Sequence, residues 1–256
     1  MIITHQQIII FFLIFARFLG LIIAAPIFSR KEFFTFGKVT FLFWISGLFL
    51  MIIPTTEVAY SYSLTFVCAL ILDFMIGILL GFTLDLPISS IELGGNIIDT
   101  QAGLSVAALL NPSTGRQETI LSILLKQITL LFFLIIDGHH FLISVLVQSF
   151  EVIPVGSLPN ISNAALTCVK FAAYIFLTAV KIAAPIMLVV FMIDFGMGIL
   201  NKLAEQINIF QLGFQVKPIV SIIIFLALIP GIADLILKVL NHSSEEIIVL
   251  LKTIKV

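Results

Sequence analysis

The stretch Ile8–Phe28, which reads IIIFFLIFARFLGLIIAAPIF, decides the fold class. It is apolar except for Arg17, and a helix that crosses the hydrocarbon core of a bilayer needs about 20 such residues. Further apolar runs follow at Val39–Ile53, Leu64–Leu84, Ile120–Ile136, Phe141–Phe150, Ala164–Ile193 and Ile219–Leu237. The sequence therefore predicts an all-α polytopic membrane protein built from hydrophobic helical hairpins.

The composition of the whole chain agrees with this prediction. Of its 256 residues 61% are hydrophobic and 11% are charged, against about 45–50% and about 25% in an ordinary soluble domain. Lipid or partner subunits must cover part of so much apolar surface. The net charge of −1 gives no basic field for nucleic acid, so nucleic-acid binding is excluded. No composition shift marks a domain boundary, and the chain is expected to be a single domain over 1–256.

One segment departs from the apolar pattern. Between Ile91 and Leu110 glycines, small residues and amides interrupt the apolar residues, and Asn111–Gly115 forms a turn sequence. Irregular backbone at membrane depth is tolerated only where it is buried in protein or lines an aqueous cavity. We therefore expect irregular backbone here, sheltered from lipid.

Charged residues also occur inside or at the edge of the apolar runs, where an ionised side chain facing hydrocarbon costs about 3 kcal/mol or more. These residues are Arg17, Asp73, Lys126, Lys181 and Asp194. They must face protein or water. One interpretation makes them structural ties that pair with each other or with neighbouring subunits. The other is an ion or proton relay, although the repeated halves typical of secondary transporters are not evident.

No catalytic, cofactor-binding or metal site is predicted. Adjacent residues on a helix point about 100° apart, so His139 and His140 are interpreted as part of a turn and not as metal ligands. Gly196 and Gly198 favour a close helix contact over a phosphate loop, because no Lys-Ser/Thr follows them. Met187 and Met192 are either core filler or a deformable lining.

Several segments together resemble the FliR family, the export-gate subunit of bacterial flagella and of type III secretion systems. The matching pieces are Arg17–Gly20 through Ala25–Pro26, Gly77–Gly81, Ile98–Gly103 leading to Asn111–Gly115, Asp137–His140 with Ser149–Phe150 and Pro154–Gly156, Ala184–Pro185, and Gln206–Phe210 to Gly213, Phe214 and Lys217. Their order and spacing cover most of the chain. One departure is Glu205, where the family usually carries proline.

This resemblance implies a non-enzymatic subunit without cofactors, located in the bacterial inner membrane at the flagellar basal body or at the base of an injectisome. It implies assembly with FliP-like and FliQ-like subunits, and with an FlhB-like subunit, around a pore for unfolded secreted proteins. The segment Gly103–Gly115 corresponds to a loop that plugs the closed pore. Val106, Leu109 and Leu110 would then form the plug, with Gly103 and Gly115 as hinges and Met187 and Met192 lining the gate.

Three alternatives stay open at this point. The chain could serve an injectisome and not a flagellum, since Ile98–Gln101 resembles that branch while Asp137–His140 resembles flagellar members. It could be a proton-coupled transporter of a small solute that uses Asp73, Lys126 or Asp194. It could also be an assembly factor with a purely structural role.

Overall fold

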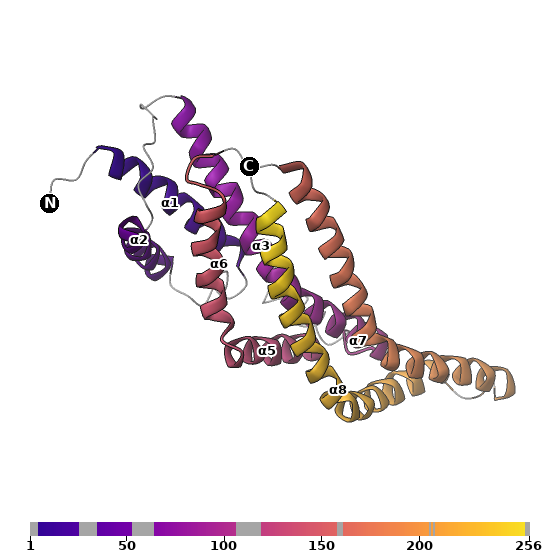
Figure 1. Ribbon diagram of the computed structural model, residues 1–256. Helices are drawn as coiled ribbons and strands as arrows, with labels where there is room; N and C mark the ends of the chain where they lie inside the picture. Colours follow the sequence, from indigo (N-terminus) through magenta and orange to yellow (C-terminus); the bar gives the residue numbers. More distant parts are fainter. Residues whose placement is uncertain are drawn as a thin grey trace. The chain divides into compact units, whose positions relative to one another are not determined.

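The computed structural model describes residues 5–25, 35–52, 64–105, 119–157, 161–204, 206 and 208–253. Every regular element in these ranges is a helix (Figure 1). The helices are α1 (His5–Ala24), α2 (Thr35–Ile52), α3 (Leu64–Ala102), α5 (Ile120–Ile135), α6 (Gly138–Val152), α7 (Ile161–Leu203) and α8 (Ile209–Thr253). The prediction of an all-α fold is confirmed.

Four of the described helices are long and apolar enough to cross a membrane, namely α1, α3, α7 and α8. The number rises to five if the bent pair of α5 and α6 is counted as one span. Helix α2 is apolar but shorter. Length and composition of the helices therefore agree with a polytopic membrane protein.

The expectation of irregular backbone from Ile91 onward is wrong as far as Ala102. Helix α3 continues through Pro87 and the glycine-rich stretch, because the glycines admit neighbouring helices and do not break the backbone. A Cβ atom on Gly94 would lie 3.2 Å from the carbonyl oxygen of Ala179 in α7, and one on Gly95 would lie 2.5 Å from the Cα atom of Ser122 in α5. Small residues that let backbones approach closely are typical of helix packing in membranes.

The chain forms two compact units, each assembled from separated segments. Unit 1 comprises Met1–Leu86, Asp137–Phe171 and Ser243–Val256, and unit 2 comprises Pro87–Ile136 and Ala172–His242. Helices α3, α7 and α8 therefore each contribute residues to both units. A single domain over 1–256 stays a prediction.

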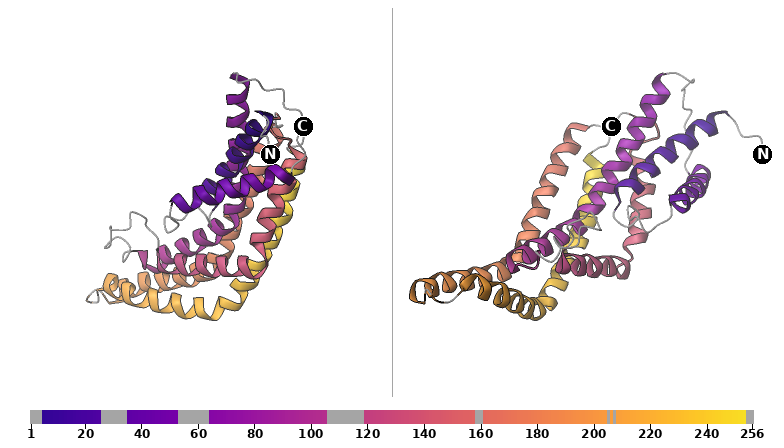
Figure 2. Two further views of the ribbon diagram at one scale, coloured as in Figure 1. Left: turned by 90° about the vertical axis from the view of Figure 1, so that its left-hand side faces the viewer. Right: turned by 180° about the vertical axis from the view of Figure 1, so that it is seen from behind.

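In unit 1, helix α1 lies against the first half of α3 (Figures 1 and 2). The contact is a close one at Gly20, Gly77 and Gly81: a Cβ atom on Gly81 would come within 2.6 Å of the carbonyl oxygen of Leu21. The buried core of unit 1 consists of side chains from α1, α2, α3 and α6 and from the last turns of α8. Phe18 joins them, with its ring 4.9 Å from that of Phe49 in α2 and 6.2 Å from that of Phe150 in α6.

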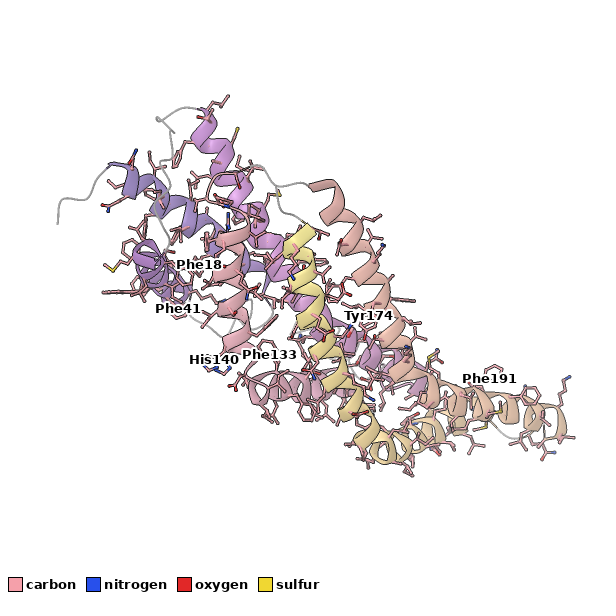
Figure 3. All side chains as sticks on the ribbon, viewed as in Figure 1. Phe18, Phe41, Phe133, His140, Tyr174 and Phe191 are labelled. Carbon is pink, nitrogen blue, oxygen red and sulfur yellow. The ribbon has the colours of Figure 1, made fainter. Side chains whose placement is uncertain are left out.

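Unit 2 carries an exposed apolar surface on α7. Along the second half of α7, large apolar side chains are exposed, including Leu188, Phe191, Phe195, Ile199 and Leu200. Figure 3 shows Phe191 among the side chains that project from this part of the helix. An exposed apolar face of this extent needs lipid or another protein to cover it.

Candidate functional site

A buried ion pair joins helices α1 and α3 of unit 1. Arg17 and Asp73 are 0% and 1% exposed, and the Nε atom of Arg17 donates a hydrogen bond of 2.8 Å to Oδ1 of Asp73. The Nη1 atom of Arg17 donates to the carbonyl oxygens of Ser149 and Ile153, each at 3.0 Å. The other carboxylate oxygen of Asp73 accepts a hydrogen bond of 3.0 Å from the backbone N–H of Gly156. The Arg17 network therefore links α1, α3, α6 and the turn that follows α6.

The Arg17 network provides the partners that two buried charges require. A buried pair is favourable only when its geometry is good and its remaining donors and acceptors are also bonded. Here the guanidinium has two further carbonyl acceptors, and its Cζ atom lies 4.3 Å from the centre of the Phe150 ring. The sequence singled out both Arg17 and Asp73, but not the carbonyl groups that complete the network.

The other three charges from the apolar runs lie elsewhere. Lys126 pairs with Glu92 at 2.9 Å in unit 2, and both side chains are about one-fifth exposed, at 19% and 22%. Asp194 in α7 pairs with Lys217 in α8. Lys181 is exposed on α7. The structure thus brings only Arg17 and Asp73 together, and it gives Lys126 and Asp194 partners that the sequence did not assign to them.

A second polar cluster lies where α3 ends and α5 begins. Asp99 is fully buried, and its Oδ2 atom accepts hydrogen bonds from the backbone N–H groups of Leu121 at 2.8 Å and Ser122 at 3.2 Å. The hydroxyl of Thr119 donates to Oδ1 of Asn96 at 2.9 Å. We call Asn96, Asp99, Thr119 and Ser122 the loop-base cluster, because it fixes both ends of the segment between α3 and α5.

Asp99 performs the role that a helix-capping residue usually performs for its own helix. The first N–H groups of a helix have no partner within it, and a side-chain oxygen just before the helix commonly accepts from the second and third. Here that oxygen belongs to α3 and caps α5. The sequence Thr119-x-x-Ser122 is the one local pattern that indicates where α5 begins.

The loop between these anchors starts at Gly103, one of the expected hinges. Gly103 has a φ of +77°, which L-residues rarely adopt and glycine adopts freely. It follows directly on the last residue of α3, the position where a left-handed residue commonly ends a helix. The other expected plug and hinge residues, Val106, Leu109, Leu110 and Gly115, lie outside the described residues.

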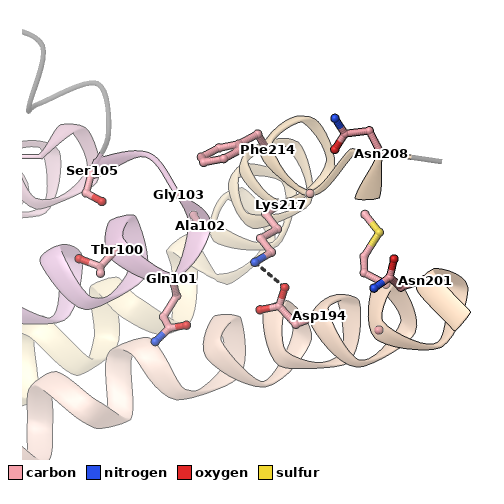
Figure 4. Close-up of a pocket in the computed structure, with 13 residues that line it drawn as sticks. Thr100, Gln101, Ala102, Gly103, Ser105, Asp194, Asn201, Asn208, Phe214 and Lys217 are labelled. Carbon is pink, nitrogen blue, oxygen red and sulfur yellow. Dashed lines mark ion pairs between the residues drawn. The ribbon is translucent and has the colours of Figure 1, made fainter. Parts of the chain in front are cut away.

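A pocket of about 760 Å³ lies next to Gly103 (Figure 4). The end of α3, the end of α7 and the start of α8 line it, and Gln101, Asn201 and Asn208 contribute amide groups. The Asp194–Lys217 ion pair stands in its wall. Amide groups and an ion pair therefore gather at this pocket, beside apolar residues such as Met197 and Phe214.

The methionine and glycine predictions for α7 have different outcomes. Met187 is half-buried and Met192 is exposed, and their place in the gate lining stays a prediction. Met197 lines the pocket. Apart from chain neighbours and the adjacent backbone of α7 itself, no described atom lies within 4 Å of a Cβ built on Gly196 or Gly198. The prediction of a close helix contact there is wrong within the described part of the chain.

The turn Asp137–His140 contradicts the geometric argument made from its sequence. The rings of His139 and His140 lie 4.2 Å apart, centre to centre, and one ligand atom from each of these residues and from Asp137 lie within 4.8 Å of one another. Neighbouring histidines therefore do converge here. Asp137 is a left-handed residue with φ of 57°, which gives the turn its sharp bend.

Comparison with known proteins adds to this geometry. The family model described as "Bacterial export proteins, family 1" matches residues 8–243. The chain belongs to this family. A flagellar biosynthetic protein FliR of Escherichia coli (strain K12) is 32% identical, over 93% of this chain and 89% of that protein. The FliR of Buchnera aphidicola subsp. Baizongia pistaciae is 35% identical, over 84% and 83%.

The chain is also similar to a protein that is not named as a flagellar protein. The Yop proteins translocation protein T of Yersinia pestis is 26% identical, over 71% of this chain and 68% of that protein. The resemblance to the FliR family is confirmed.

Proposed function

We propose that this chain is a non-enzymatic subunit of the flagellar type III export gate and forms part of the pore through which unfolded proteins are secreted. Family membership supports the general role. The two FliR proteins, at 32% and 35% identity, are more similar to it than the Yersinia protein T at 26%, which supports the flagellar system over an injectisome.

The loop-base cluster is the observation that carries the gating role. It holds the start of α5, from Thr119 to Ser122, beside Asn96 and Asp99 near the end of α3 in unit 2. A loop of small and apolar residues on such a base can seal a pore against ions by excluding water and can still move aside for a passing chain. Gly103 supplies the freedom at one hinge, and Gly115 is proposed for the other.

The Arg17 network supports structural ties over a proton relay. A relay residue needs water or a free donor or acceptor along its path, whereas Arg17 and Asp73 are enclosed and bonded on both sides. This observation counts against the transporter that would use Asp73 in proton coupling. Lys126, Lys181 and Asp194 are proposed as ties within the bundle or to neighbouring subunits.

The exposed apolar faces support a location within a larger membrane assembly. We infer that FliP-like and FliQ-like subunits, with an FlhB-like subunit beside them, cover the apolar face of α7 that includes Met192. The half-buried Met187 is proposed to line the gate next to this face. The assembly would stand in the inner membrane at the flagellar basal body, with energy supplied by other components.

Deletion of Ser105–Leu110 tests the gating role. Cells that carry the assembled gate should leak ions when the segment is removed, because the apolar seal is lost while the helices remain. Replacing the same residues with glycine and serine keeps the length of the loop and should also cause leakage. Conductance is measured together with the amount of gate that assembles.

The control is Lys238→Gln, which removes an exposed pair with Asp234 on α8 and should leave conductance unchanged. Unchanged conductance in both loop variants, with normal assembly, would exclude the plug and favour an assembly factor. A purified chain that binds a small solute as a stable monomer or dimer would instead support the transporter.

A further inference from the structure

Three side chains with metal-binding groups meet in unit 1, apart from every residue used in the proposed gate. They belong to Asp137, His139 and His140, within four consecutive positions. One ligand atom from each lies within 4.8 Å of the other two, and all three residues are exposed. Nδ1 of His140 lies 3.4 Å from Oδ1 of Asp137.

The carboxylate of Asp137 has an unusual orientation for its position. Asp137 is the residue immediately before α6, where an aspartate side chain ordinarily accepts hydrogen bonds from the first N–H groups of the helix. Here the side chain makes no such capping bond. The left-handed backbone at Asp137 instead brings its carboxylate to the His140 ring, so an oxygen that usually caps the helix is available as a ligand.

The three groups match the chemistry of a borderline divalent cation. Imidazole nitrogen and carboxylate oxygen are the usual ligands of Zn²⁺, at about 2.0–2.2 Å from the metal. Rotation of three exposed side chains is enough to bring ligand atoms that are already within 4.8 Å onto one ion. Hard cations such as Mg²⁺ prefer oxygen ligands throughout, so two imidazoles select against them.

We propose that Asp137, His139 and His140 form a binding site for a Zn²⁺-like divalent cation, with water in the remaining coordination positions. The site shares no residue with the loop-base cluster or with the pocket in unit 2. A cation bound there would join the residue before α6 to the first turn of that helix. A cation close to a helix N-terminus is ordinarily unfavourable, because that end of the helix carries a partial positive charge. The negative charge of the Asp137 carboxylate would compensate for this repulsion.

The test uses the full chain, purified in detergent with any co-expressed partners and with an affinity tag that contains no histidine. After treatment with EDTA, ZnCl₂ is titrated by calorimetry and bound metal is counted by elemental analysis. The chain should bind one zinc ion, and an excess of MgCl₂ should not displace it. Loss of a partner of a metal ligand already weakens metal binding by about tenfold or more, so loss of a ligand itself should weaken it at least as much.

The variants Asp137→Asn, His139→Gln and His140→Gln should each show this loss. Asparagine tolerates a left-handed backbone, so Asp137→Asn removes the charge while it keeps the turn. His242→Gln is the control, because His242 lies against Tyr174 in unit 2, with ring centres 4.6 Å apart. The proposal is overturned if the unaltered chain binds no zinc, or if the three variants bind it as tightly as the His242→Gln control.

Discussion

Arg17 and Asp73 show at the scale of single residues how far reasoning from sequence extends. Each stood out because an isolated charge in an apolar run must find a partner or water. Their separation of 56 positions meant that the pairing depended on how α1 and α3 pack, which no local pattern encodes. The carbonyl groups of Ser149 and Ile153 carry no signal in the sequence, since every residue has a carbonyl group.

Replacing Asp73 with asparagine should strongly destabilise the protein. It removes the counter-charge from a fully buried guanidinium, and breaking a buried pair in this way typically costs about 3–5 kcal/mol. The double variant Arg17→Met with Asp73→Leu should be closer in stability to the unaltered chain, because no unpaired charge remains. Thermal unfolding in detergent measures both.

Asp234→Asn provides the comparison, since the Asp234–Lys238 pair is exposed on α8. Exposed helical pairs of this kind contribute about 0.3–0.5 kcal/mol. Equal losses of stability for Asp73→Asn and Asp234→Asn would show that the Arg17 network is not a structural tie.

At the scale of helices, the apolar runs were predictable and their boundaries were not. Length and hydropathy identify α1 and the first half of α3, but the stretch from Ile91 onward is wrongly expected to be irregular backbone. It is helical because Gly94 and Gly95 face α7 and α5 at short range. The same residue type permits a bend in one place and a close helix contact in another, and the neighbour that decides between them is distant in sequence.

Replacement by alanine should have opposite effects on stability at Gly77 and at Gly47. A Cβ atom on Gly77 would clash with the backbone of Arg17, whereas one on Gly47 would meet no described atom within 4 Å. Gly47→Ala should therefore stabilise α2 by up to about 1 kcal/mol, the usual difference between the two residues in a helix. Gly77→Ala should lower the unfolding temperature, because α1 and α3 must move apart.

Thermal unfolding of the two variants under the same detergent conditions checks this pair. Similar stabilisation by both would mean that α1 does not approach α3 as closely as the structure shows. Gly37→Ala, also in open surroundings on α2, should behave like Gly47→Ala.

At the scale of the whole molecule, the chain exposes more large apolar side chains than a lone soluble protein would. Phe36, Trp44 and Met51 on α2 are 71–81% exposed, and α7 presents a further row. Composition alone anticipated this surplus. It did not indicate which helix faces remain uncovered, because a helix that is apolar on all sides has no pattern to distinguish a buried face from an exposed one.

We expect the chain to be recovered in good yield only when its partners are produced with it. Expressed alone, it should aggregate or require lipid, because its uncovered faces would associate. Size-exclusion chromatography after co-expression with FliP-like and FliQ-like subunits measures the outcome. A monodisperse chain that remains in solution without detergent would contradict the interpretation as a membrane subunit.

Since Asp99 of α3 caps α5, the position of α5 does not depend on which residues form the loop between the two helices. Because a side chain of α3 accepts hydrogen bonds from the N–H groups of Leu121 and Ser122, the start of α5 is tied directly to α3, whatever the length of the segment between them. Insertions or deletions between the two anchors can therefore accumulate over evolution while the helices stay in register.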